Sequence, residues 1–168
     1  GRLPLTFDRD VEHLPAFDDY RMDGRTYRYA KTDPVYPFGH GLSYTTFAYK
    51  RLTLSSTLPG QLKVTAVVTN TGLRAGDEVA QLYLRFPITP GAPNIALRGF
   101  QRFHLRRGEA RVIEFTLSPR DLSSVDLNGI RRVAAGNYSL SVGSGQPGYD
   151  GSRVTSPFII AETIAIVP

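Results

Sequence analysis

The 168-residue sequence contains no cysteine, no tryptophan and a single methionine. Without cysteine the chain can form no disulfide, no thiolate metal site and no cysteine nucleophile. No apolar run approaches the roughly 20 residues that a membrane-spanning helix needs, so we expect no membrane partner. Residues 1–4 also lack the basic start of a signal peptide. With 41% hydrophobic and 21% charged residues, the composition is that of a globular protein with one domain, or one domain and an appendage.

Lysine is scarce as well, because 17 of the 20 basic residues are arginine, and the net charge is +5. A positive net charge is compatible with nucleic-acid binding. The arginines are spread along the whole chain, however, and their densest group, at 102–111, is interrupted by apolar residues and by Glu109. We therefore expect solvated strand faces and no nucleic-acid partner.

Histidines are few and scattered. The three histidines, His13, His40 and His104, are far apart and show none of the short spacings that bring two ligands to one ion. We expect no metal site and no cofactor.

Residues 1–46 differ in composition from the remainder. They hold five of the nine tyrosines and several prolines, and beyond a short apolar alternation at 3–7 they follow no helical or strand period. Asp23-Gly24 and Asp33-Pro34 indicate turns. A segment this long and irregular does not build its own core, so its aromatic rings are expected to pack on another surface, either the downstream domain or one that this chain lacks. Packing between domains is predicted for Leu3, Leu5, Phe7, Tyr27, Tyr36, Phe38 and Tyr44.

From Phe47 onward short apolar alternations are separated by turn residues every 8 to 12 positions. Residues 61–69 place Leu62, Val64, Ala66 and Val68 on one face of a strand. Further strands are predicted at 77–86, 97–105, 110–117, 138–142 and 154–160. This pattern, almost without helix, predicts an all-β, immunoglobulin-like (fibronectin III-like) two-sheet sandwich with a long, largely irregular N-terminal extension. The missing Cys-Trp-Cys set argues against an antibody-type domain.

Three local features sharpen this prediction. Phe100 and Phe103 break the alternation of their strand, which predicts a bulge. Ser118 and Pro119 are typical of the start of a short helix, as N-cap and first helical residue. Asn128-Gly129 within 125–133 is the strongest short signal for a β-hairpin.

Residues 36–47 read Tyr-Pro-Phe-Gly-His-Gly-Leu-Ser-Tyr-Thr-Thr-Phe. This segment resembles the signature that precedes the C-terminal fibronectin III-like domain of glycoside hydrolase family 3, the β-glucosidases and β-xylosidases. His40 departs from the pattern, where tyrosine is common. Other segments that resemble the family are 1–7, 27–29, 68–72, 75–83, 97–100 and 136–143. The resemblance implies that 1–46 are the end of an α/β-sandwich domain with a connecting segment, and that 47–168 are the fibronectin III-like sandwich.

Family members are retaining β-glycosidases whose aspartate nucleophile lies in a (β/α)8 barrel and whose glutamate acid/base usually lies in the α/β-sandwich domain. No residue of this chain matches either position, so no catalytic residue is assigned. The chemistry agrees, because retaining hydrolysis needs two carboxyl groups about 5–5.5 Å apart. Asp77 and Glu78 are neighbours on a predicted strand, so their side chains are expected to point to opposite faces.

The resemblance implies a structural role: the C-terminal module of a retaining family 3 β-glycosidase, by default a β-glucosidase that removes terminal β-linked glucose. Its partners would be the barrel and the α/β-sandwich domain of the same enzyme. The resemblance also allows the chain to pair with a second copy of itself in a homodimer. The substrate of the whole enzyme would be a β-linked oligosaccharide, and its location periplasmic or secreted. Arg28 and Tyr29 are candidates for the rim of the substrate cleft.

Two other functions stay open on the residues alone. In the first, the chain is an independent carbohydrate-binding or adhesion module, in which exposed tyrosines stack on sugars. Alternatively, it is the small chain of a split glycosidase and works with a larger partner chain. The short alternation of Leu3, Leu5 and Phe7 favours a fragment, because such a strand would pair with a sheet in a complete enzyme and leave an exposed edge here.

Overall fold

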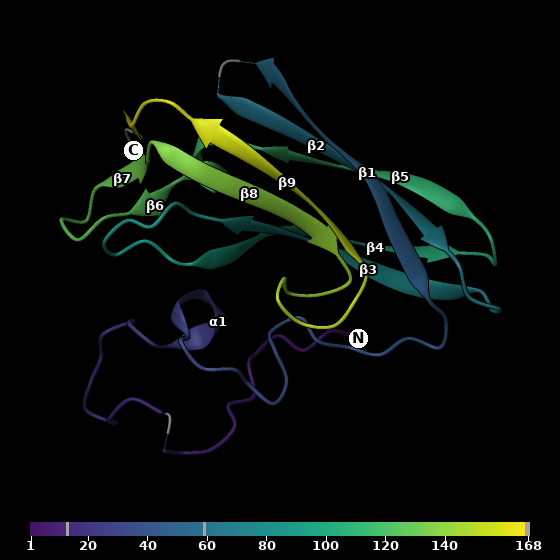
Figure 1. Cartoon of the computed structure of the whole chain (residues 1–168), viewed down its shortest axis with the longest axis horizontal. Helices are drawn as coiled ribbons and strands as arrows, with labels where there is room; N and C mark the ends of the chain where they lie inside the picture. The colour runs from purple at the N-terminus through teal and green to yellow at the C-terminus, as the bar shows by residue number, and fades with distance from the viewer. Residues whose placement is uncertain (13, 59, 167–168) are drawn as a thin grey trace.

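The computed structural model describes residues 1–12, 14–58 and 60–166 of the chain. Its sandwich is built from antiparallel sheets that face each other, with the N-terminal extension lying along one side (Figure 1). The strands are β1 (Phe47–Leu58), β2 (Gln61–Asn70), β3 (Gly76–Arg85), β4 (Ile95–Leu105), β5 (Ala110–Leu117), β6 (Ser124–Val125), β7 (Arg131–Val133), β8 (Gly136–Gly143), β9 (Arg153–Ile160) and β10 (Ile164–Ala165). The sheet orders are β1-β2-β5, β4-β3-β8-β9 and β10-β7-β6. The predicted all-β sandwich is confirmed.

The core lies between the two larger sheets and follows from strand alternation. In β2 every second residue is buried, and Val64 pairs with Phe115 of β5 while Ala66 pairs with Ile113. The facing sheet contributes alternate residues of β3 and β8. The fully buried apolar side chains of that sheet include Ala80, Leu82, Leu84, Leu140 and Val142.

The predicted bulge in the fourth strand is confirmed but lies elsewhere. Leu82 of β3 pairs with Gly99, and the next residue, Tyr83, pairs with Leu97, so Arg98 is the extra residue. Phe100 and Phe103 are three positions apart and point to opposite faces, with Phe103 in the core and Phe100 exposed. The bulge therefore follows from register and not from these two rings.

Both other local predictions are confirmed. Helix α2 (Pro119–Leu122) begins at an N-cap serine, Ser118, in a capping box with Asp121. Strands β6 and β7 form the hairpin around Asn128-Gly129, but they are shorter than the predicted 125–133 span. The backbone between them is held by the Asp126 carboxylate, which accepts hydrogen bonds from the N–H groups of residues 128 and 130.

The extension is largely irregular, as predicted, with one helical turn, α1 (Thr26–Tyr29), that the sequence did not indicate. Its alternating start does not add a full strand to a sheet. Phe7 forms a single bridge with Tyr36, and Leu3 exchanges backbone hydrogen bonds with Gly39 and His40. Residues 3–7 thus pair with the extension's own second half. Neither helix in the described part of the chain is long and apolar enough to cross a membrane.

Candidate functional site

The extension is fastened to the sandwich at a buried carboxylate. Glu78 of β3 is 1% exposed, and the Nη2 atom of Arg2 lies 3.0 Å from each of its carboxylate oxygens. The Tyr49 hydroxyl donates to the same carboxylate at 2.7 Å, and Arg2 also donates to the Gly41 carbonyl at 2.8 Å. Burial, and then the adjacent Glu78 carboxylate, raise the pKa of Tyr49 far above its usual range. A buried charge is tolerated because the extension supplies its counter-charge.

A second attachment covers the outer face of β3. Gln81 donates to the Gly39 carbonyl at 3.0 Å and accepts from the Tyr83 hydroxyl at 2.6 Å. Gly39 has φ +77°, and a Cβ atom there would lie 2.1 Å from the Gln81 amide oxygen. Gly41 has an ordinary φ, but its Cβ would lie 2.3 Å from the Gly1 carbonyl oxygen. Both glycines of the signature therefore permit close approach, and Gly39 also supplies the left-handed backbone.

Two of the predicted packing residues lie in this attachment. The Tyr27 ring stacks on Phe38 with centroids 4.1 Å apart and meets Tyr83 edge-on. The Tyr27 hydroxyl accepts a hydrogen bond from the Leu97 N–H at 3.0 Å, which ties α1 to β4. Tyr27 and Phe38 thus pack on the sandwich of the same chain.

Four of the five other predicted packing residues are exposed. Leu5, Phe7 and Tyr36 are each about half exposed, Tyr44 is 98% exposed, and Leu3 is partly buried. Phe7 and Tyr36 contact each other edge-on, with centroids 6.0 Å apart. Of the twenty exposed large hydrophobic residues in the described chain, eleven belong to the extension: Leu5, Phe7, Val11, Leu14, Phe17, Tyr20, Met22, Val35, Tyr36, Leu42 and Tyr44. Soluble monomers rarely expose so much apolar surface in one segment, which indicates a partner surface.

The structure places the candidate rim residues Arg28 and Tyr29 side by side on α1. Both are partly buried, and the Arg28 guanidinium lies 5.8 Å from the centre of the Tyr29 ring. Their role at the rim of a substrate cleft stays a prediction.

The neighbouring carboxylates of Asp77 and Glu78 are both engaged in ion pairs. Asp77 and Glu78 point to opposite faces of β3, as expected. Asp77 is exposed and pairs with His104 at 2.7 Å and Arg102 at 2.6 Å. Hydrogen bonds from His104 first, and then from Arg102, lower the pKa of Asp77. Within residues 1–12, 14–58 and 60–166, no three histidine, aspartate or glutamate side chains gather as a metal site requires, and His13 lies outside the described residues.

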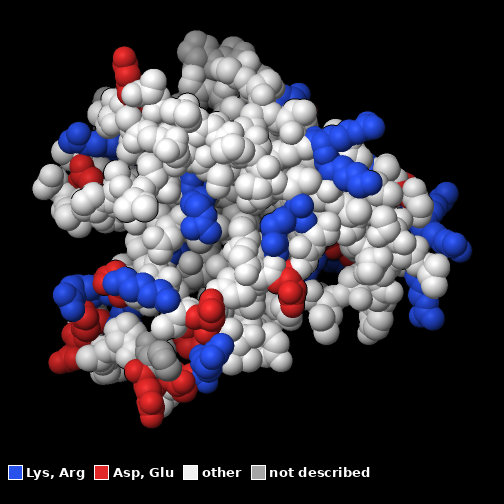
Figure 2. Space-filling model, viewed as in Figure 1, with Lys and Arg blue, Asp and Glu red and all other residues white. Residues whose placement is uncertain are grey.

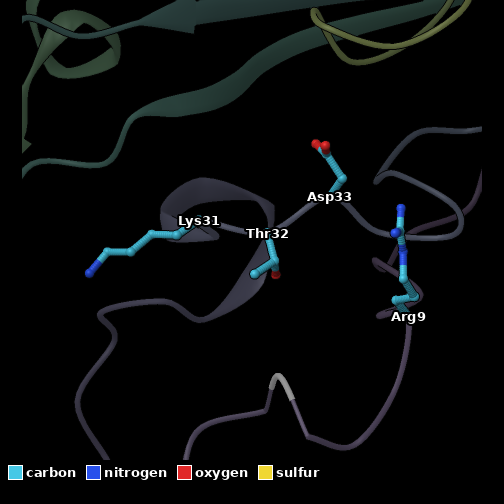
Figure 3. A pocket seen from close by; sticks show the side chains of 4 residues that line it. All are labelled: Arg9, Lys31, Thr32 and Asp33. Carbon is cyan, nitrogen blue, oxygen red and sulfur yellow. The ribbon is translucent and has the colours of Figure 1, made fainter.

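A hollow of about 310 Å³ in the extension is lined by Arg9, Lys31, Thr32 and Asp33. Figure 3 shows that these side chains do not converge, since Lys31 points away from the Asp33 carboxylate. Asp33 instead accepts a hydrogen bond from the Tyr149 hydroxyl at 3.3 Å, which ties the extension to the loop after β8. Acidic and basic side chains are also intermixed over the extension (Figure 2). The hollow therefore has no chemistry of its own.

Comparison with known proteins identifies the region. The fibronectin type III-like domain family matches residues 78–146. The xylan 1,4-β-xylosidase of Xylanibacter ruminicola is 36% identical over 92% of this chain, and the periplasmic β-glucosidase of Salmonella typhimurium is 38% identical over 70%. The solved β-glucosidase 3B of Thermotoga neapolitana superposes on the whole chain with TM-score 0.85 and 34% identity.

In each case this chain corresponds to a minor part of a larger protein. It covers 18% of the Xylanibacter relative, 17% of the Salmonella relative and 25% of the Thermotoga structure. The GH3 β-glucosidase of Bifidobacterium adolescentis gives the same picture, with TM-score 0.83, 27% identity and coverage of 97% of this chain and 26% of that one. The chain belongs to glycoside hydrolase family 3, as the C-terminal region that carries the fibronectin type III-like domain.

Proposed function

We propose that this region braces the catalytic domains of a retaining β-glycosidase. The extension is fixed to the sandwich through Arg2, Gly39 and Tyr27, and many of its other residues are exposed and apolar. This exposed apolar surface is the observation that carries the proposal, because burying it on a second domain would stabilise the assembly by roughly 25 cal/mol for each Å² covered. The partners are the barrel and α/β-sandwich domains of the same enzyme, in the same or a separate chain.

The whole enzyme is proposed to remove terminal β-linked glucose from oligosaccharides. Support comes from relatives and solved structures named as β-glucosidases, whereas β-xylosidases among the relatives make a β-xyloside the alternative substrate. Rates on aryl β-glucosides and aryl β-xylosides, measured on the full enzyme, decide between them. A periplasmic or secreted location is supported by the relative named as periplasmic.

Two exposed residues of the extension test the bracing role. Phe17 is 97% and Tyr44 98% exposed, so Phe17→Ser and Tyr44→Ser should leave the unfolding free energy of this chain within about 0.5 kcal/mol of wild type. In the full enzyme the same changes should lower the thermal midpoint. Ile88→Ser, on a loop of the sandwich, is the matched control and should change neither. Unchanged stability of the full enzyme in both extension variants would refute bracing through this surface.

Nearly complete exposure of Tyr44, together with that of Tyr20, also suits a carbohydrate-binding module, because a free ring can stack on a sugar face. Affinity electrophoresis of this chain in gels that contain soluble β-glucan or xylan separates the two functions. Retardation that Tyr44→Ser abolishes supports sugar binding, and migration without retardation supports bracing.

The proposal that Arg28 and Tyr29 lie at the rim of the substrate cleft fails if their alanine variants keep the full enzyme's kinetics on long oligosaccharides.

A further inference from the structure

Two arginines from separate elements donate hydrogen bonds to one fully buried serine, Ser123, and a third lies on α1, the helix that is tied to β4. Arg98, the bulge residue of β4, donates from Nη2 to the Ser123 carbonyl at 3.0 Å. Arg131 of β7 donates from Nη1 to the Ser123 hydroxyl at 3.1 Å. Arg28 follows Tyr27, whose hydroxyl accepts from the N–H of Leu97, the residue before Arg98, and the Arg28 carbonyl accepts from the Asn94 N–H at 2.8 Å, next to the start of β4.

The cluster has an excess of positive charge. The carboxylate that acts on Arg98 belongs to Asp121, and this group is already engaged by the N–H and hydroxyl of Ser118 at 2.8 and 2.7 Å. Burial, and then the charge of Arg28, lower the pKa of Arg98. Like charges brought together away from water are costly unless an anion neutralises them.

Hydrogen-bonding capacity is also unused. Arg28 and Arg98 each have a buried Nε atom for which the described residues provide no hydrogen-bond partner. Buried donors in native proteins are nearly always paired, and an acceptor placed between Arg28 and Arg98 would pair both Nε atoms. An acceptor that satisfied two guanidinium groups would need several oxygens and a negative charge.

We propose that Arg28, Arg98 and Arg131 form a binding site for one oxyanion, with a carboxylate as its natural ligand. Guanidinium groups match carboxylates because their planar N–H pairs fit the two oxygens. The carboxylate comes either from an acidic side chain of another domain or from an acidic sugar such as a uronic acid. The site lies within this chain and does not rest on the proposed bracing role.

Thermal unfolding of this chain in low millimolar sodium sulfate, against sodium chloride of equal ionic strength, tests the site. Because an anion that binds only the folded state raises its stability, we expect sulfate to raise the wild-type midpoint by roughly 2–4 °C. Arg98→Met keeps an apolar stem over Phe86 but loses the charge, and should lose the response. Arg107→Met removes an exposed charge from the β4–β5 turn and should retain it.

The outcomes are distinct. No sulfate response in wild type, or an equal response in Arg98→Met, overturns the site. Should Arg98→Met fail to fold, Arg131→Met provides the same comparison. Acetate and glucuronate then replace sulfate as probes. Equal responses to both support a protein side chain as the source, and a stronger response to glucuronate supports an acidic sugar. A response to sulfate but to neither carboxylate overturns the carboxylate assignment.

Discussion

The ion pair between Arg2 and Glu78 should be the main bond between the extension and the sandwich, and Arg2→Met tests this. The Glu78 side chain is 1% exposed and that of Arg2 16%, so the pair is shielded from solvent. Removing one partner of a buried pair leaves an uncompensated charge, which typically costs 3–5 kcal/mol. Because Tyr49 still donates to the carboxylate, we expect about 3 kcal/mol, at the lower end of this range.

Urea unfolding of this chain, followed by circular dichroism, measures the loss. Arg9→Met, on an exposed arginine of the same extension, is the control and should lie within about 0.5 kcal/mol of wild type. Glu78→Gln combined with Arg2→Met should recover part of the loss, because a neutral amide needs no counter-charge. A loss below about 1 kcal/mol for Arg2→Met, or no recovery in the double variant, would refute the reasoning.

Three further predictions follow from the same contacts. Gly39→Ala should destabilise the chain by about 2 kcal/mol in urea, because alanine at positive φ is strained and its Cβ would displace Gln81; an effect near zero would contradict this attachment. Tyr49 should stay protonated as the pH rises past the ordinary tyrosine pKa of about 10. The unfolded state then loses a proton that the folded state keeps, so stability falls above that pH. The 295 nm absorbance should show equal numbers of tyrosines ionising before unfolding in wild type and in Tyr49→Phe, and one more in wild type after unfolding. Asp77 should stabilise the fold above pH about 4 and lose this contribution as acid protonates it. Asp77→Asn should therefore flatten the acid limb of the stability profile, whereas an unchanged limb would exclude stabilisation by the contacts of Asp77 with His104 and Arg102.

Local patterns were enough to predict most of the sandwich. The alternation in 61–69 and the Ser118-Pro119 pair are confirmed because strand burial and helix capping depend on residues only a few positions apart. The bulge was assigned to the wrong residues because register depends on the partner strand, which places the extra residue at Arg98. The single turn at Thr26–Tyr29 was not predicted because its stability comes from packing on β4 and not from helix propensity.

The candidate site was only partly predictable. The aromatic residues of the extension were predicted to be packing residues because many of them lie in a segment without a core. The sequence could not divide them into those that pack on the sandwich, such as Tyr27 and Phe38, and those that face outward, such as Tyr44. That division depends on the path of the extension across β3 and β4, which no short period encodes.

The sequence by itself determined the all-β class, the positions of the main strands and the resemblance to family 3, because these rest on alternation, turn residues and motifs read along the chain. Only the tertiary structure showed that Glu78 is buried against Arg2, 76 residues away, and that the distant Arg98 and Arg131 both donate to Ser123. The physical reason is that a buried charge is tolerated only beside its counter-charge. Which residues become neighbours is set by how the sheets and the extension pack, not by their spacing in the sequence.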